Sequence, residues 1–198
     1  LMERKEELDD PWCIGFFVDN EIDWGEPSTL GEWTLQCPST QPAKVEMVNI
    51  LKKKYQQVQS LNEAWETDYR SWEELLKLTT LPPKKALDDC TEFSVRMTEA
   101  YFQIVHDEFK KAAPNKLYMG CRFARSNENV IRIGADYCDL ISYNIYKRNL
   151  NGFKLPMGID KPVIIGEFHF GALDRGLFHP GLVKTTNQEE RAACYAEY

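Results

Sequence analysis

The sequence has few histidines, no close cysteine pair and no excess of basic residues, and each shortage argues against a class of function. Its three histidines and six cysteines form no Cys-x-x-Cys pair and no zinc-ligand spacing. With 24 basic and 31 acidic residues, a net charge of −7, the chain lacks the basic face that binds nucleic acid. No apolar run approaches the ~20 residues of a membrane span. We therefore expect no metal, no organic cofactor, no nucleic acid and no membrane among its partners.

The composition is that of a folded domain, because 43% of the 198 residues are hydrophobic and 12% are aromatic. Cys13, Cys121 and Cys138 lie in or beside apolar runs, so we expect the cysteines to be free core thiols. The chain begins at Leu1 and stops at Tyr198, inside an expected helix. We therefore treat residues 1–198 as part of a longer polypeptide, truncated at both ends.

Short apolar runs alternate with helical patterns along the chain, which predicts an α/β fold with parallel strands. Four runs predict buried strands: residues 13–19, 117–123, 139–146 and 162–170. Helical patterns occupy residues 43–64, 84–112, 129–135 and 188–198, with a shorter helix capped by Ser71 and a loop over 23–42. A complete (β/α)8 barrel takes about 250 residues, so four strands with their helices predict about half of one.

Polar side chains follow each predicted strand where it ends, which is costly unless those side chains are paired or functional. They are Asn20 and Glu21 after the first strand, Arg122 after the second, Asn144 and Tyr146 after the third, and Glu167 and His169 after the fourth. In α/β barrels the chemistry lies at the carboxyl ends of the strands. The pattern predicts one shared polar pocket.

Two carboxylates on different strands, Glu21 and Glu167, suit the hydrolysis of a glycosidic bond. One protonates the leaving oxygen and the other attacks the anomeric carbon, at a separation of ~5–5.5 Å in retaining enzymes. Their 146-residue separation in the sequence is no obstacle (167 − 21 = 146), because a barrel brings strand ends together.

Two motifs carry a resemblance to a known family. The run Gly15-Phe-Phe-Val-Asp-Asn-Glu-Ile-Asp-Trp24 resembles the Asn-Glu acid/base motif of clan A glycoside hydrolases. The run Lys161-Pro-Val-Ile-Ile-Gly-Glu-Phe-His-Phe-Gly171 resembles the nucleophile strand of that clan. In their longer form both are most similar to the β-agarase family, with β-galactosidases as the nearest relatives. The clan places these motifs on the fourth and seventh barrel strands, and two further strands lie between them here.

The resemblance implies a role for each residue. Glu21 would be the general acid/base and Glu167 the nucleophile of a retaining enzyme that cleaves β-galactosidic bonds in agarose-like galactans through a covalent intermediate. Substrate-binding residues would be Asn20, Trp24, Arg122, Asn144, Tyr146 and His169, with Trp33 a further candidate for sugar stacking. A polymeric substrate also implies secretion or a periplasmic location, although the sequence itself leaves the compartment open.

Structural alternatives stand beside these roles. Glu21 is also suited to a turn, Glu167 to a structural ion pair, and His169 to a structural hydrogen bond. Arg122 would then only balance the glutamates. Trp24 and Trp33 would be anchors of the loop core. Tyr143 and Tyr146 alternate in facing, so only one can point inward, and we expect Tyr146.

Two other functions compete with hydrolysis. The first is an inactive carbohydrate-binding or interaction fragment, because four strands with open edges leave apolar surface and backbone groups unpaired. The missing half of the barrel would then come from the rest of the same chain or from an oligomer, and we expect the segment alone to have little activity. The second is a metal site formed by Asp19, Glu21, Glu167 and His169. The glycan itself and exo or endo cleavage are left open.

Overall fold

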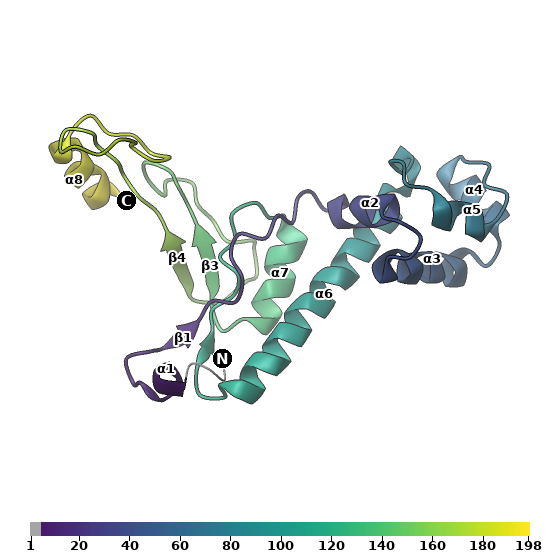
Figure 1. Cartoon of the computed structure of the whole chain (residues 1–198), viewed down its shortest axis with the longest axis horizontal. Helices are drawn as coiled ribbons and strands as arrows, with labels where there is room; N and C mark the ends of the chain where they lie inside the picture. Colours follow the sequence, from purple (N-terminus) through teal and green to yellow (C-terminus); the bar gives the residue numbers. More distant parts are fainter. Residues whose placement is uncertain (1–4) are drawn as a thin grey trace. The chain divides into compact units, whose positions relative to one another are not determined.

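Residues 5–198, the part of the chain that the computed structural model describes, adopt a mixed α/β fold with parallel strands (Figure 1). Two parallel pairs are formed: β1 (Gly15–Phe16) with β2 (Leu117–Tyr118), and β3 (Ile141–Asn144) with β4 (Val163–Glu167). All four expected strands are thus present and parallel, although each hydrogen-bonded strand is shorter than its apolar run.

The two pairs meet through Phe123, which lies a few residues beyond β2. Phe123 forms a parallel bridge with Tyr143 of β3, its N–H donates to the Ser142 carbonyl at 2.8 Å, and its own carbonyl accepts from the Asn144 N–H at 3.0 Å. Positive φ angles at Gly120 (75°) and Arg122 (51°) interrupt the regular ladder before Phe123. The four strands therefore neighbour one another in chain order, as parallel crossover units require.

Helices occupy the connections. They are α1 (Lys5–Asp9), α2 (Thr29–Gln36), α3 (Pro42–Tyr55), α4 (Val58–Trp65), α5 (Trp72–Lys77), the 3₁₀ turn η1 (Lys84–Ala86), α6 (Leu87–Ala112), α7 (Glu128–Tyr137) and α8 (Gln188–Glu197). The expected long helix is confirmed as η1 followed by α6, and the helices expected near residues 129 and 188 are confirmed as α7 and α8. Ser71 caps α5 as expected, its hydroxyl accepting from the Glu74 N–H.

Two expectations for the connection between β1 and β2 are wrong. The helix expected over 43–64 is broken between α3 and α4, where Gln56 has a φ of 63°. The loop expected over 23–42 contains α2. The Gly-, Pro- and Trp-rich composition of this segment concealed α2, which places Leu35 in the core of unit 2.

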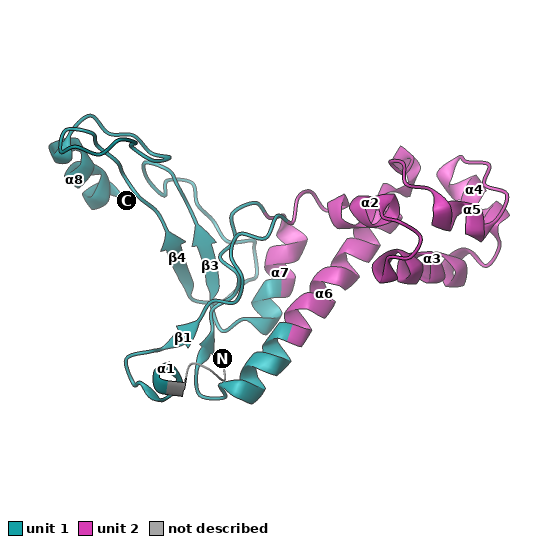
Figure 2. Ribbon diagram, in the orientation of Figure 1, with its two compact units in different colours: residues 1–23, 105–125, 134–198 teal, residues 24–104, 126–133 magenta. Residues whose placement is uncertain are grey.

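The chain divides into two compact units (Figure 2). Unit 1 contains all four strands and comprises residues up to 23, 105–125 and 134–198; unit 2 comprises residues 24–104 and 126–133. Unit 2 is helical and includes α2 to α5. The strand ends, and hence most of the residues expected in the site, belong to unit 1.

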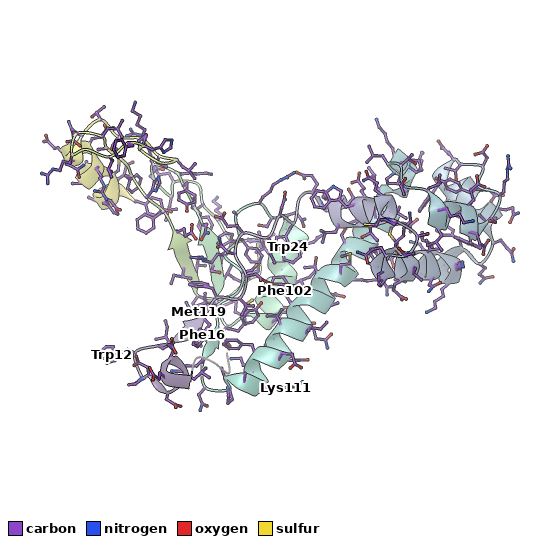
Figure 3. The ribbon with its side chains drawn as sticks, viewed as in Figure 1. Trp12, Phe16, Trp24, Phe102, Lys111 and Met119 are labelled. Carbon is purple, nitrogen blue, oxygen red and sulfur yellow. The ribbon has the colours of Figure 1, made fainter. Side chains whose placement is uncertain are left out.

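Unit 1 packs its first two strands closely against the end of α6. The Phe109 ring contacts the rings of Phe16 and Tyr118 at centroid distances of 6.3 and 5.5 Å. The Met119 N–H donates to the Phe16 carbonyl at 2.9 Å, next to the strand pair (Figure 3). A side chain at Gly15 would lie 2.3 Å from the Leu117 carbonyl oxygen, so this approach of β1 to β2 requires glycine.

Unit 2 has its own apolar core, formed by Leu35, Met47, Val48, Leu51, Leu61, Trp65, Leu75, Ala86, Cys90 and Phe93. One carboxylate is buried at its margin. Asp89 accepts hydrogen bonds from Lys54 Nζ (2.6 Å), the Tyr55 hydroxyl (2.7 Å) and Trp65 Nε1 (2.7 Å). Asp89 thereby joins α3, α4 and α6, and burial together with this hydrogen bond raises the pKa of Tyr55.

All six cysteines are free thiols, as expected, and four of them are buried: Cys90, Cys121, Cys138 and Cys194. Burial raises the pKa of Cys90 and of Cys138 to about 12, so both thiols stay protonated and act as small apolar side chains. Among the described residues, no helix combines the length and the apolar character needed to span a membrane.

Replacing Asp89 by Ala should destabilise the protein by about 3 kcal/mol, because the buried donors of Tyr55 and Trp65 lose their acceptor. Glu92→Ala is the matched control, since Glu92 binds the same Lys54 from a side chain that is 41% exposed. That control should cost about 0–1 kcal/mol. Urea unfolding followed by circular dichroism measures both, and equal costs would contradict the role assigned to Asp89.

Candidate active site

Seven of the eight predicted site residues lie in unit 1, in or just beyond its strands: Asn20, Glu21, Arg122, Asn144, Tyr146, Glu167 and His169. Backbone hydrogen bonds hold the segment that follows β1 beside the segment that follows β2. The N–H groups of Val18 and Glu21 donate to the carbonyls of Gly120 and Cys121, both at 3.0 Å. Parallel strands thus bring these polar ends to one edge, as expected.

Three non-glycine residues at this edge adopt left-handed backbone conformations. Asp19, Glu21 and Arg122 have φ angles of 63°, 52° and 51°. Such conformations cost about 1–3 kcal/mol each and persist only where the surroundings enforce them. Two of the three side chains, Glu21 and Arg122, were expected in the site from the sequence. The strain thus coincides with the candidate site, as is common for side chains held in a functional orientation.

Glu21 is held by a neutral amide. Asn144 Nδ2 donates to Glu21 Oε1 at 2.8 Å and to Asn20 Oδ1 at 3.3 Å. Asn144 is buried, and its own Oδ1 has no hydrogen-bond partner. An amide donor orients a carboxyl group without adding a positive charge beside it.

Glu167 is held by a cation and a phenol. Arg122 Nη2 lies 3.0 Å from Glu167 Oε1, and the Tyr146 hydroxyl donates to Glu167 Oε2. Both partners stabilise a negative carboxylate. The hydrogen bond to Glu167 raises the pKa of Tyr146 to about 12, helped by burial and by the negative charges of Glu167 and Glu21. Tyr146 therefore remains a donor at any working pH, within electrostatic reach of both glutamates.

A bulge at Gly166 shapes this part of the site. Tyr143 pairs with Ile165 but Asn144 pairs with Glu167, so Gly166 is the unopposed extra residue. A Cβ atom at Gly166 would lie 2.6 Å from Arg122 Cδ. The missing side chain lets Arg122 cross β4 to reach Glu167, and the guanidinium also lies 5.2 Å from the centroid of the Phe17 ring.

His169 links the strand of Glu167 to the loop that follows it. Its ring contacts Tyr146 edge-on, with centroids 5.5 Å apart, and its Nε2 accepts from the Leu182 N–H at 2.8 Å. This is the structural hydrogen bond considered for His169 from the sequence. It leaves Nδ1 as the ring nitrogen available to another partner.

Trp24 belongs to the core of unit 2. It is 4% exposed and stacks on Phe102, with centroids 5.6 Å apart and planes 18° apart (Figure 3). The anchor role considered for this residue matches that burial, so we leave Trp24 out of the sugar-binding set. Trp33, which is 48% exposed, keeps a free surface.

Phe17, Gly166 and Leu182 contribute to the site without having been predicted from the sequence. Phe17 and Gly166 lie inside the two recognised motifs, but nothing in their spacing signals contact with Arg122. In residues 5–198 no group of three or more His, Cys, Asp or Glu side chains is arranged to hold a metal ion. The geometry instead offers two carboxyl groups with different partners, one beside an amide and one beside a cation and a phenol.

Comparison with known proteins agrees with this chemistry. A family model described as β-galactosidase, glycoside hydrolase family 42, matches residues 8–157. Beta-agarase B of Vibrio sp. (strain JT0107) is 37% identical over 96% of this chain and 21% of its own length, and Beta-agarase A of the same strain is 34% identical over 94% and 21%. The chain thus spans about a fifth of the length of these curated relatives.

Solved structures agree as well. The crystal structure of an agarase aligns with a TM-score of 0.87 and 38% identity, over all of this chain and 30% of that one. The structure of an exo-beta-agarase aligns with a TM-score of 0.88 and 34% identity, over 99% of this chain and 28% of the other. Because the family model matches more than half of its length, the chain belongs to the β-galactosidase family of glycoside hydrolases, family 42, and it is similar to β-agarases.

Proposed function

We propose that this chain carries the catalytic pair of a retaining glycoside hydrolase that cleaves β-galactosidic bonds in agarose-like galactans. The observation that carries the proposal is the contrast between the two carboxyl groups. The Glu167 carboxylate contacts Arg122 and Tyr146, whereas the Glu21 carboxylate accepts a hydrogen bond from the neutral amide of Asn144. A retaining mechanism needs this difference, an ionised nucleophile beside a group that gives up a proton.

The roles follow from these partners. Glu167 attacks the anomeric carbon while Glu21 protonates the leaving oxygen, which yields a covalent glycosyl-enzyme. Glu21 then takes a proton from water, and that water releases the sugar from Glu167. Asn20 and Asn144 lie beside Glu21, where the exposed Asn20 would bond a sugar hydroxyl and the buried Asn144 orients Glu21. Arg122, Tyr146 and His169 complete the subsite around Glu167.

The four strands would correspond to the fourth to seventh strands of a (β/α)8 barrel. Their parallel pairing in chain order and the bonds that link β1 to the segment after β2 support this assignment. The rest of the barrel would come from the remainder of the same polypeptide or from an oligomer. Since the similar proteins are agarases, the galactan would be extracellular, and we propose secretion or a periplasmic location.

Glu21→Gln should lower kcat by about 10²- to 10⁴-fold in the full-length polypeptide, because the leaving oxygen loses its proton donor. Glu167→Gln should be at least as damaging, since no glycosyl-enzyme forms. Reducing ends released from agarose measure both rates. Glu189→Gln, an exposed glutamate on α8, is the control and should leave kcat unchanged.

Azide separates the two roles. With Glu167→Gly, azide replaces the nucleophile and should yield the α-galactosyl azide, whereas with Glu21→Ala it attacks the glycosyl-enzyme and should yield the β-anomer. NMR of the product distinguishes the anomers. Full activity in either glutamate variant, or the opposite anomers, would contradict the assignment.

Tyr146→Phe should lower kcat by about 10- to 100-fold, because a hydrogen bond to a charged group is lost. The basic limb of the kcat/KM profile should stay in place, because the pKa of Tyr146 is about 12 and the phenol does not ionise in the working range.

Tyr143→Phe is the matched control for Tyr146, since Tyr143 lies on the same strand and packs on Phe123 and Phe153. It should leave kcat unchanged. An unchanged kcat in Tyr146→Phe would show that its hydroxyl does not act on the nucleophile.

The second candidate, an inactive carbohydrate-binding fragment, is favoured by the extent of the chain, which spans about a fifth of its curated relatives. We expect the isolated 198 residues to turn over little or no galactan, because β1 and β4 each have one edge without a strand partner among residues 5–198. A chromogenic β-galactoside and size-exclusion chromatography test this together. Measurable turnover by a monomer of this length would contradict the expectation.

A further inference from the structure

The side chain of His169 contacts both the phenol at the candidate nucleophile and the loop that follows β4. Its ring meets the Tyr146 ring edge-on, with centroids 5.5 Å apart and planes 71° apart. Its Nε2 accepts a hydrogen bond from the Leu182 N–H at 2.8 Å. One imidazole thus connects the hydroxyl that donates to Glu167 with a segment thirteen residues further along the chain.

The segment that holds His169, residues 180–185, is itself fixed beside the end of β4. The Gly171 N–H donates to the Val183 carbonyl at 2.9 Å, and the Thr185 N–H donates to the Gly171 carbonyl at 2.8 Å. Gly171 also forms a parallel bridge with Lys184. This backbone pairing makes the 180–185 segment a fixed support for the imidazole ring.

Tyr146 has a second contact with the same segment. Its ring packs against a small buried apolar cluster, which consists of Phe170, Val183 and Cys194. Because Val183 belongs to the 180–185 segment, that segment supports Tyr146 both directly and through His169.

The approach of this segment to the imidazole requires glycine at position 181. Gly181 has a φ of 73°, and a Cβ atom there would lie 1.9 Å from Cε1 and 2.1 Å from Nε2 of His169. The backbone therefore packs directly on the ring, next to the Leu182 N–H that binds it. Any side chain at this position would displace the ring.

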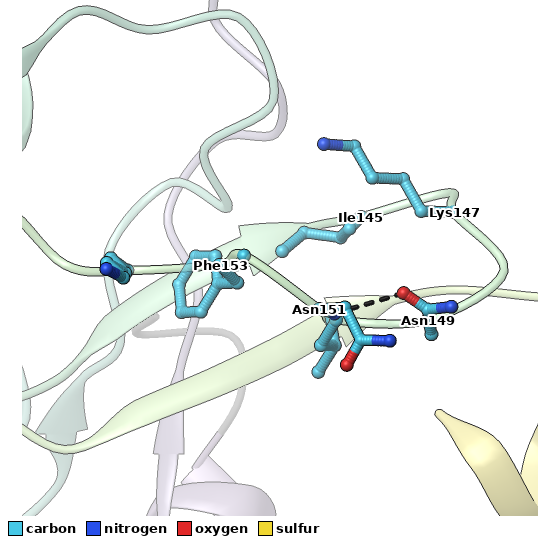
Figure 4. Close-up of a pocket in the computed structure, with 8 residues that line it drawn as sticks. Ile145, Lys147, Asn149, Asn151 and Phe153 are labelled. Carbon is cyan, nitrogen blue, oxygen red and sulfur yellow. Dashed lines mark hydrogen bonds between the residues drawn. The ribbon is translucent and has the colours of Figure 1, made fainter.

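The backbone around Tyr146 is fixed through its neighbour in the chain. The Ile145 N–H donates to the Glu167 carbonyl at 2.9 Å, and the Tyr198 hydroxyl donates to the Ile145 carbonyl at 2.9 Å. The loop that follows encloses a hollow lined by Ile145 and Lys147 but not by Tyr146 (Figure 4). The Tyr146 side chain therefore points away from this hollow, and the contacts of its ring decide where its hydroxyl lies.

We propose that His169 is a positioning residue, whose ring fixes the Tyr146 hydroxyl on the Glu167 carboxylate. The segment at Gly181 and Leu182 holds that ring in place. The inference rests on the proposed function, because it takes Glu167 to be the nucleophile. It differs from the direct sugar contact that the family resemblance implies for His169. Loss of a positioning residue lowers kcat, whereas loss of a contact that binds substrate and transition state equally raises KM.

His169→Ala in the full-length polypeptide, with agarose as the substrate, tests the proposal. It should lower kcat by about tenfold and leave KM within about twofold, because the hydroxyl at the nucleophile loses a support. In a Tyr146→Phe background, which lacks that hydroxyl, the same change should lower kcat by less than about twofold. His106→Ala, on α6, is the control and should leave kcat unchanged. An unchanged kcat in His169→Ala, a loss confined to KM, or losses that multiply in the double variant would overturn the proposal.

Gly181→Ala displaces the same ring without altering His169. It should lower kcat by about tenfold, and only when the Tyr146 hydroxyl is present. Gly176→Ala is the matched control, since Gly176 lies in the same loop with a φ of 87°, and nothing beyond its chain neighbours would lie within 4 Å of a Cβ atom there. It imposes a similar backbone strain and should leave kcat unchanged. Full activity in Gly181→Ala, or equal losses in the two glycine variants, would contradict the role of the ring.

Thermal unfolding shows whether each variant is folded. If Gly181→Ala is not, the comparison of His169→Ala in the wild-type and Tyr146→Phe backgrounds still decides the question.

This inference and the proposed function fail differently. If the catalytic assignment is wrong, Glu21→Gln and Glu167→Gln keep their activity. If only the positioning role is wrong, those two variants lose activity, whereas His169→Ala keeps the wild-type kcat.

Discussion

The candidate site depends on the absence of one side chain. Gly166 lets Arg122 cross β4, since a Cβ atom there would lie 2.6 Å from Arg122 Cδ. The same residue is the bulge that brings Glu167, rather than Gly166, opposite Asn144. The bulge thus sets which residue of β4 lies opposite Asn144, and the missing side chain leaves room for the Arg122–Glu167 ion pair. Any larger residue would have to displace the arginine or the strand.

The edge that carries the chemistry is also where the backbone is least regular. Left-handed conformations at Asp19, Glu21 and Arg122 and short strand pairings indicate that this edge gives up local stability for side-chain orientation. The compensation lies in the packing of unit 1, with Phe109 between Phe16 and Tyr118, and in the anchors on α8. Unit 2 is stabilised separately by its own apolar core and by Asp89.

The segment after β3 ties the candidate site to α8. Tyr146 contacts Glu167, and Arg148, two residues further along, forms an ion pair with Glu190 of α8 at 2.6 Å. The Tyr198 hydroxyl donates to the Ile145 carbonyl at 2.9 Å, which fixes the same segment beside the end of the chain.

The sequence alone determined the parallel α/β pattern, the four strands and the set of polar strand ends, because apolar periodicity and the carboxyl-end rule are local signals. It did not determine the break at Gln56 or helix α2, which depend on packing within unit 2. Only the tertiary structure decided that Arg122 pairs with Glu167, that Asn144 binds Glu21 and that Trp24 is buried. Partners of this kind depend on the register between distant strands, and a single bulge changes that register without leaving a periodic trace in the sequence.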